Sequence, residues 1–155
     1  MTTREIHNPH DDGSCECDTP ILVYLAAPFT SDDPRVEHKR VVDTDQAAGM
    51  MTQMGAMIYS PLNHFAYPFM RRTPADRAYA HGIHMLARCD ALLVLCLDGW
   101  AESEGVRRES EYADRWGMPR VLVEPNGEEE LEDQLVAALN VLQREVNAEE
   151  SDVRD

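Results

Sequence analysis

Lysine is almost absent from this sequence: Lys39 stands alone, and the other basic residues are arginines, giving 14 basic against 29 acidic residues. The formal net charge of −15 excludes general binding to nucleic acid or to an anionic membrane, which requires clustered basic side chains. Salt screens the repulsion between carboxylates, so we interpret the composition as an adaptation to a salt-rich, halophilic cytoplasm. An ordinary acidic protein from a GC-rich genome is the alternative.

Long apolar runs and a leader pattern are missing as well. No stretch approaches the length of a membrane-spanning helix, and the first residues lack the basic and apolar regions of a signal peptide. We therefore expect a cytoplasmic protein without a membrane partner. A length of 155 residues predicts one domain with a core of its own.

The four cysteines do not have the pattern of a disulfide framework. Cys89 and Cys96 lie at or in an apolar run, where a free thiol behaves as a small apolar side chain. Cys15 and Cys17, with histidines nearby, are either a weak metal motif or part of a polar tail. The tail is the preferred interpretation, and we expect neither a metal nor a cofactor.

Short apolar runs alternate four times with helical patterns. The expected strands are 21–26, 57–59, 91–97 and 120–123, and the expected helices are 36–54, 75–88, 103–116 and 131–146. This alternation predicts an α/β fold: a single Rossmann-like or flavodoxin-like domain of four to five parallel strands with helices on both faces. We expect the domain to span residues 20–146, between a polar N-terminal tail (1–19) and a charged, frayed C-terminal tail (147–155).

Ligands of such sheets bind beyond the carboxyl ends of the strands. We therefore expect residues 24–30, 60–69 and 98–109 to surround one crevice, with 63–74 forming a long loop beside it. No G-x-G-x-x-G follows the first strand, and no G-x-x-x-x-G-K-[ST] occurs anywhere. The common dinucleotide and nucleoside triphosphate cradles are therefore excluded.

Glu109 interrupts the apolar face of the third predicted helix. The expected inward positions of that helix are Val106, Glu109, Ala113 and Trp116. A carboxylate in such a stripe is either paired with a cation or used chemically, because burying an unpaired charge is costly. Ser103 and Gly105 place a hydroxyl and unhindered N–H groups at the start of the same helix, which is where anions bind.

A carboxylate beside an anion site suits glycosyl chemistry. Glutamate can attack the anomeric carbon of a sugar and form a covalent intermediate, since the transition state resembles an oxocarbenium ion. The helix start would hold a 5′-phosphate of that sugar, and aromatic rings such as Tyr24 and Phe29 would flank the leaving base.

Three motifs carry a family resemblance: Tyr24-Leu-Ala-Ala-Pro-Phe29 at the first strand end, Cys89-Asp90 before the third strand, and Ser103-x-Gly105-Val106-x-x-Glu109-x-x-x-Ala113. Together they resemble the nucleoside 2-deoxyribosyltransferase superfamily. Ser60-Pro61 with His64, and Asp98-Gly99-Trp100 before the serine, are similar to its DUF1937 branch. The resemblance covers roughly residues 21–125.

The resemblance implies that Glu109 is the nucleophile and that Tyr24 lies beside it and the reacting sugar. Ser103 and Gly105 match the phosphate-holding positions of 2′-deoxynucleoside 5′-monophosphate N-hydrolases, and Val106 continues that motif. The transferases that act on unphosphorylated nucleosides usually carry Asp where Ser103 stands. A nucleotide substrate and hydrolysis are therefore favoured.

Further substrate-binding candidates around the expected crevice are Phe29, His64, Asp98 and Trp100. His64 either contacts phosphate or base, or caps or packs within its loop. Trp100 either closes the site or packs at an interface.

One position departs from the family pattern. Relatives commonly carry an Asp eight residues before the position of Asp90, where it assists protonation of the leaving base, and Gly82 stands there in this chain. His81 and His84 flank it, and either imidazole could supply the proton. A surface role for both histidines, a register shift of the helix and loss of activity are the alternatives.

The predicted function is hydrolysis of the N-glycosidic bond of a (deoxy)nucleoside 5′-monophosphate, or base exchange on a deoxynucleoside. The alternatives are a non-catalytic domain that binds a nucleotide or an ADP-ribose-like ligand, and a structural protein with a vestigial crevice. The expected partner is a small-molecule nucleotide or nucleoside, and the resemblance implies a homodimer or a larger homo-oligomer.

Overall fold

Four parallel strands form one sheet in the order β2-β1-β3-β4. The computed structural model describes residues 20–64, 67–125 and 130–153, so the predicted N-terminal tail with Cys15 and Cys17 lies outside the described residues. The strands are β1 (Leu22–Ala26), β2 (Met57–Tyr59), β3 (Ala91–Leu95) and β4 (Arg120–Val123). The helices are α1 (Pro34–Gln53), α2 (Pro61–His64), α3 (Tyr67–Met70), α4 (Ala75–Leu86), α5 (Glu104–Trp116) and α6 (Leu131–Val153), with the 3-10 turn η1 (Trp100–Glu102) before α5.

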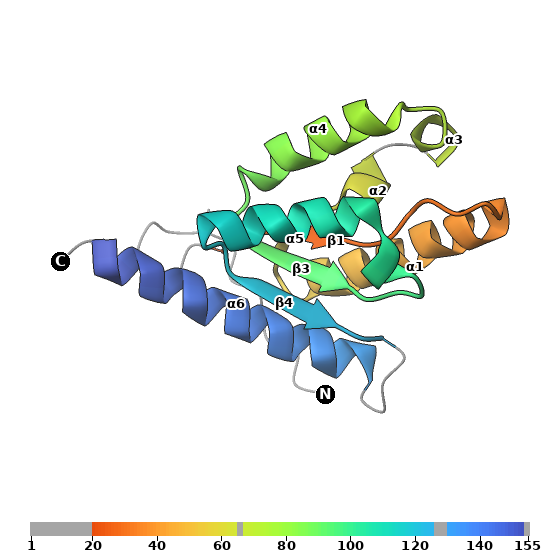
Figure 1. Ribbon diagram of the computed structural model, residues 1–155. Helices are drawn as coiled ribbons and strands as arrows, with labels where there is room; N and C mark the ends of the chain where they lie inside the picture. Colours follow the sequence, from red (N-terminus) through yellow and green to blue (C-terminus); the bar gives the residue numbers. More distant parts are fainter. Residues whose placement is uncertain (1–19, 65–66, 126–129, 154–155) are drawn as a thin grey trace, which may run out of the picture.

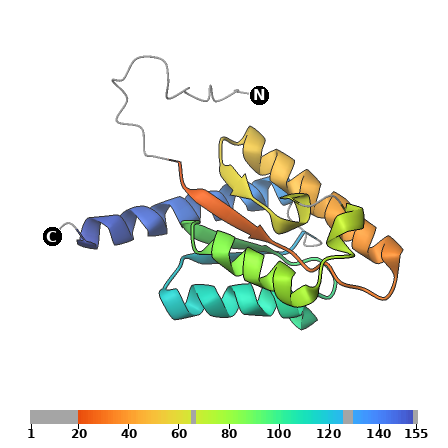
Figure 2. The ribbon, with the colours of Figure 1, turned by 90° about the horizontal axis from the view of Figure 1, so that it is seen from above.

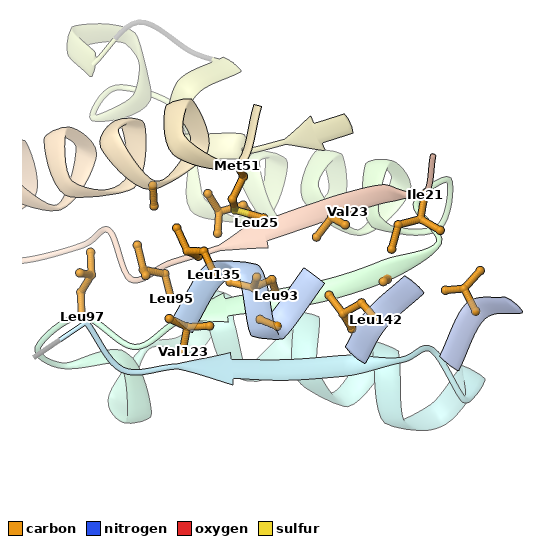
Figure 3. Packing of buried hydrophobic residues seen from close by; sticks show 14 residues of the cluster. Ile21, Val23, Leu25, Met51, Leu93, Leu95, Leu97, Val123, Leu135 and Leu142 are labelled. Atoms are coloured by element: carbon orange, nitrogen blue, oxygen red, sulfur yellow. The ribbon is translucent and has the colours of Figure 1, made fainter. Parts of the chain in front are cut away.

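Helices cover both faces of the sheet, which confirms the predicted α/β fold. Figures 1 and 2 show α1 and α6 on one side of the sheet and α4 and α5 on the other. On the α1/α6 side, Leu25, Leu93 and Leu95 pack against Met51 and Leu135 (Figure 3). The opposite side of the same strands contributes a second, smaller cluster to which Tyr24 belongs. Strands buried on both faces explain why their sequences read as continuous apolar runs.

The chain changes direction across the sheet between β1 and β3. The crossover through α1 places β2 on one side of β1, whereas the next crossover places β3 on the other side. The loops after β1 and β3 therefore diverge at this point, where open α/β sheets bind their ligands.

Local sequence explains where α1 begins and ends. Asp33 caps the helix by accepting a hydrogen bond from Arg35 N (2.9 Å), and Pro34 occupies the first helical position. Beyond its end, Gly55 adopts a left-handed conformation (φ 88°) that a residue with a Cβ rarely adopts.

Three expectations need correction. The expected loop at 63–74 contains α3 and the end of α2, and His64 is the last residue of α2. The last helix does not fray after Val146 but continues to Val153. Trp116, expected to face inward, is 66% exposed, because it lies in the final turn of α5, which Gly117 ends. Its ring contacts Tyr112 and Arg115 instead.

Among the residues that the structure describes, no helix combines the length and the apolar character needed to cross a membrane.

Candidate active site

A hydrogen bond joins β1 to α5 beneath the carboxyl edge of the sheet. The Tyr24 hydroxyl donates to Glu109 Oε1 at 2.6 Å. The Tyr24 side chain is fully buried, and Glu109 is half-buried between α5 and its neighbours. Glu109 therefore does interrupt the inner face of α5, as its spacing predicts, and its partner is a phenol rather than a cation.

The surroundings of Glu109 change its acidity. Burial raises the pKa of Glu109 to about 7, and the hydrogen bond from Tyr24 acts in the opposite direction. The pKa of Tyr24 is raised far above its ordinary value by burial and by the nearby Glu109 charge, so its hydroxyl remains a donor. A carboxylate that is poorly solvated and held by one hydrogen bond is suited to attack an electrophilic carbon.

Gly82 on α4 completes the contact between these two side chains. A Cβ at this position would lie 2.9 Å from the Tyr24 hydroxyl oxygen and 3.6 Å from Glu109 Oε1. The backbone of α4 therefore approaches the pair more closely than any residue with a side chain permits. The position of the Asp that the resemblance expects is thus beside Glu109, and this chain has no acid there.

Two histidines and a second tyrosine lie next to this pair. Tyr59, at the end of β2, has its ring 5.4 Å from that of Tyr24, between centroids. Its hydroxyl lies 3.1 Å from His81 Nε2, and the His81 ring stacks on His64 at 5.3 Å. Burial raises the pKa of Tyr59 to about 12, with contributions from the thiol of Cys89 and the charge of Glu109.

His84 does not join this cluster. Its side chain is exposed. Because Gly82 faces Tyr24, a residue two positions further along α4 points about 200° away around the helix.

The start of α5 has the geometry of a capped helix. The Ser103 hydroxyl accepts from Val106 N at 3.4 Å, so this hydroxyl serves as the N-cap. The Gly105 position faces Tyr79, which a Cβ there would approach to 3.5 Å. Glu104 pairs with Arg107 and Arg108 on the outer surface, and their hydrogen bonds lower its pKa to about 2.

Val106 and Trp100 contribute mainly to packing. Val106 is 2% exposed within the apolar cluster between the sheet and α5, and Trp100 packs against that cluster. Their side chains hold the start of α5 against β3, which positions the backbone of the loop at 98–105.

Arg40 on α1 is, like Tyr59, a site residue that the sequence did not reveal. Its guanidinium donates to the carbonyl oxygens of Phe29 (3.2 Å), Thr30 (2.8 Å) and Asp98 (2.6 Å). It therefore ties the loop after β1 to the loop after β3. Gly99, with φ 84°, lies against the same guanidinium, which a Cβ there would approach to 2.6 Å. Asp98 itself is exposed, and it contributes its backbone carbonyl oxygen, which accepts from Arg40.

A shallow groove lies outside this site, at the far end of α5. Its lining residues are 113–114, 117–120, 145 and 148–149, and it contains more acidic side chains than basic ones, since Arg120 is its single basic residue. Within 20–64, 67–125 and 130–153, no group of three or more His, Cys, Asp or Glu side chains is arranged to hold a metal ion.

Comparison with known families confirms the DUF1937 part of the predicted resemblance. Residues 21–125 match the family described as a domain of unknown function, DUF1937. The chain belongs to the DUF1937 family. The matched segment contains β1 to β4, and with them Tyr24, Gly82 and Glu109, so the DUF1937 region carries the whole candidate site. No curated protein matches the sequence.

Proposed function

We propose that this protein hydrolyses the N-glycosidic bond of a (deoxy)nucleoside 5′-monophosphate through a covalent intermediate on Glu109. The observation that carries the proposal is the 2.6 Å hydrogen bond from Tyr24 to Glu109, whose carboxylate is half-buried and has its pKa raised to about 7. Salt-bridged structural carboxylates normally have a lowered pKa, so this environment favours a reactive group.

In the first step, a carboxylate oxygen of Glu109 bonds to the anomeric carbon while the carbon–nitrogen bond to the base breaks. Its negative charge stabilises the positive charge that develops on the sugar. Tyr24 orients the carboxylate from below. In the second step, water attacks the anomeric carbon and releases Glu109. A deoxynucleoside acceptor in place of water gives base exchange, the transferase variant of the same reaction.

A 5′-phosphate is proposed at the start of α5. The supporting features are the helix N-terminus, the absence of a side chain at Gly105, and Glu104, which is turned outward by Arg107 and Arg108. Phe29 and Asp98 belong to the loops after β1 and β3, Trp100 begins the turn η1 before this helix, and His64 lies against His81. Ser103 and Val106 would contribute by shaping the backbone at that helix start, where the Ser103 hydroxyl accepts a hydrogen bond from Val106 N.

Gly82 supports one alternative. Because no acid stands at this position beside Glu109, a domain that binds a nucleotide or ADP-ribose-like ligand without cleaving it is the second candidate. Turnover distinguishes the two, since a binding domain shows a ligand-dependent rise in melting temperature and releases no base.

The test is to incubate the protein in molar KCl with a panel of ribo- and deoxyribonucleoside monophosphates and nucleosides. Chromatography then detects any free base that is released. We expect one class of monophosphate to be cleaved by the wild type and not by Glu109→Gln. Glu111→Gln is the matched control, because Glu111 lies on the outer surface of the same helix, paired with Arg107, and this variant should retain activity. A folded wild type that cleaves no member of the panel contradicts the proposal.

We also propose that the protein acts in a salt-rich cytoplasm as a homodimer or larger homo-oligomer. Light scattering after size-exclusion chromatography in molar KCl tests the assembly, and a monomer at micromolar concentration contradicts it.

A further inference from the structure

The base must receive a proton as it departs, because a nucleobase nitrogen is a poor leaving group as an anion. None of the three groups in the Tyr24–Glu109–Gly82 contact can provide it. Glu109 is the nucleophile, the Tyr24 hydroxyl already donates to Glu109, and Gly82 has no side chain. This inference rests on the proposed function and concerns the source of that proton.

Tyr59, His81 and His64 form a group of titratable side chains beside this contact. Tyr59 is in register with Tyr24 on the neighbouring strand, so both rings lie on the same face of the sheet. The Tyr59 ring lies 5.4 Å from the Tyr24 ring, between centroids, and the Tyr24 hydroxyl donates to Glu109, so one side chain separates Tyr59 from the carboxylate. His81 precedes Gly82 on α4 and reaches the same hydroxyl from the other side.

We propose that the Tyr59–His81 pair donates the proton to the leaving base. As the carbon–nitrogen bond breaks, its electron pair stays on the base nitrogen, which takes the hydroxyl proton of Tyr59. Tyr59 in turn takes the Nε2 proton of the His81 imidazolium across the 3.1 Å contact. When water attacks the glycosyl intermediate, its proton returns along the same route and restores the imidazolium.

His64 acts as a positioning residue in this arrangement. Its ring stacks on His81 at 5.3 Å and lies 5.6 Å from the Tyr59 ring. The stacking of His64 on His81 holds the His81 ring, whose Nε2 faces the Tyr59 hydroxyl. The short helix α2, which follows β2, carries His64 at its end.

The experiment compares two leaving groups. One substrate is the nucleoside monophosphate that the wild type cleaves, and the other is a 4-nitrophenyl (deoxy)riboside 5-phosphate, whose 4-nitrophenolate departs without a proton. For His81→Gln and Tyr59→Phe we expect kcat on the nucleotide to fall about 100-fold or more, and kcat on the aryl substrate to fall less than about threefold. Activity on the aryl substrate also shows that each variant is folded.

Two further variants sharpen the test. His81→Gln combined with Tyr59→Phe should be no slower on the nucleotide than either single variant, because both break one route. His84→Gln is the matched control, since it removes an exposed imidazole from the same helix, and it should keep the wild-type rate on both substrates.

Equal losses on both substrates, or no loss on the nucleotide, would overturn the proton route while leaving the glycosidase intact. A loss confined to His84→Gln would transfer the role to that residue and equally overturn it. A wild type that cleaves neither substrate would instead contradict the proposed function itself.

Discussion

Two effects act in opposite directions on the pKa of Glu109. Burial disfavours its charge, whereas the hydrogen bond from the Tyr24 hydroxyl favours it, and burial is the larger effect. The folded protein therefore keeps a group that would be ionised more easily in the unfolded chain. Such a residue costs stability at neutral pH.

Replacement of Glu109 by Gln should stabilise the protein above neutral pH. The pKa of Glu109 rises on folding from 4.5 to about 7, so the wild type loses stability as the pH increases through this range. Gln does not titrate and still accepts from Tyr24. We expect Glu109→Gln to be more stable by roughly 3 kcal/mol at pH 8.5 and nearly equal at pH 4.5, measured by urea unfolding in molar KCl. An equal difference at both pH values would contradict this assignment.

Replacement of Tyr24 by Phe should move the pH dependence of activity. The proposed nucleophile must be ionised, so kcat/KM, which reports on the free enzyme, rises with pH through the pKa of Glu109. Without the Tyr24 hydrogen bond, which lowers that pKa, the acidic limb should shift upward by about one pH unit. Rate–pH profiles of the wild type and the variant measure this shift. A profile that is lower but unshifted would show that Tyr24 does not control the charge of Glu109.

The sequence could predict Glu109 because a carboxylate in an apolar helical stripe is visible from spacing alone. It could not predict Arg40, whose partners are backbone carbonyl oxygens, one of them 58 positions away in the chain. Every residue has a backbone carbonyl oxygen, so the sequence does not show which of them accept a hydrogen bond from Arg40. The choice between His81 and His84 also needed the structure, because the face of α4 that meets Tyr24 is set by the phase of the helix around Gly82.

At the scale of elements, the site depends on how closely α4 and α5 approach β1. Ser103 fixes the start of α5 as its N-cap, and Val106 and Ala113 bury its inner face against the sheet. The helix α4 comes close to Tyr24 only because Gly82 has no side chain. Helix phase and a glycine therefore determine the site as much as the functional groups do.

Gly82→Ala and Gly49→Ala should have opposite effects. Alanine at position 82 would meet the Tyr24 hydroxyl at 2.9 Å, and Tyr24 is 0% exposed and cannot move aside freely. We expect Gly82→Ala to lose activity at least about tenfold and to lose about 1–3 kcal/mol of stability. Gly49, within α1, has no heavy atom within 4 Å of its Cβ position, so Gly49→Ala should gain about 0.5–1 kcal/mol.

Unfolding curves and base-release rates of the two variants check this comparison. An active, stabilised Gly82→Ala would show that the close approach of α4 is unimportant.

Element order was predictable because the two central strands, β1 and β3, are buried and continuous apolar runs, and because Asp33-Pro34 marks a helix start. The short helices α2 and α3 were not, since four-residue helices have no period to detect and are set by packing. Trp116 follows the inward period of α5, yet it is exposed because the helix ends at that point. The period of a helix predicts which way a side chain points, but not whether a neighbouring element extends far enough to cover it.

At the scale of the whole molecule, four elements contribute to one site. Tyr24 comes from β1, Tyr59 from β2, Gly82 and His81 from α4, and Glu109 from α5. The order β2-β1-β3-β4 brings them together across the point where the chain reverses direction. Around this site the net charge of −15 opposes folding unless salt screens it.

Stability should therefore increase with salt. We expect the melting temperature to rise by about 5 °C or more between 0.1 M and 2 M KCl, because the screening length falls to a few ångströms. Betaine, a net-neutral osmolyte that does not screen charges, is the control and should give a smaller rise. A melting temperature that is unchanged or lower in 2 M KCl would contradict the interpretation of the acidic composition.

The covalent bond to Glu109 is the central claim, and labelling tests it most directly. A 2-fluoro-2-deoxy analogue of the cleaved nucleotide should slow release of the sugar, because fluorine destabilises the oxocarbenium-like transition state. Peptide mass analysis should then find one sugar phosphate on the peptide that contains Glu109, in step with loss of activity, and none in Glu109→Gln. A label on a different residue of the inactivated enzyme would contradict the account.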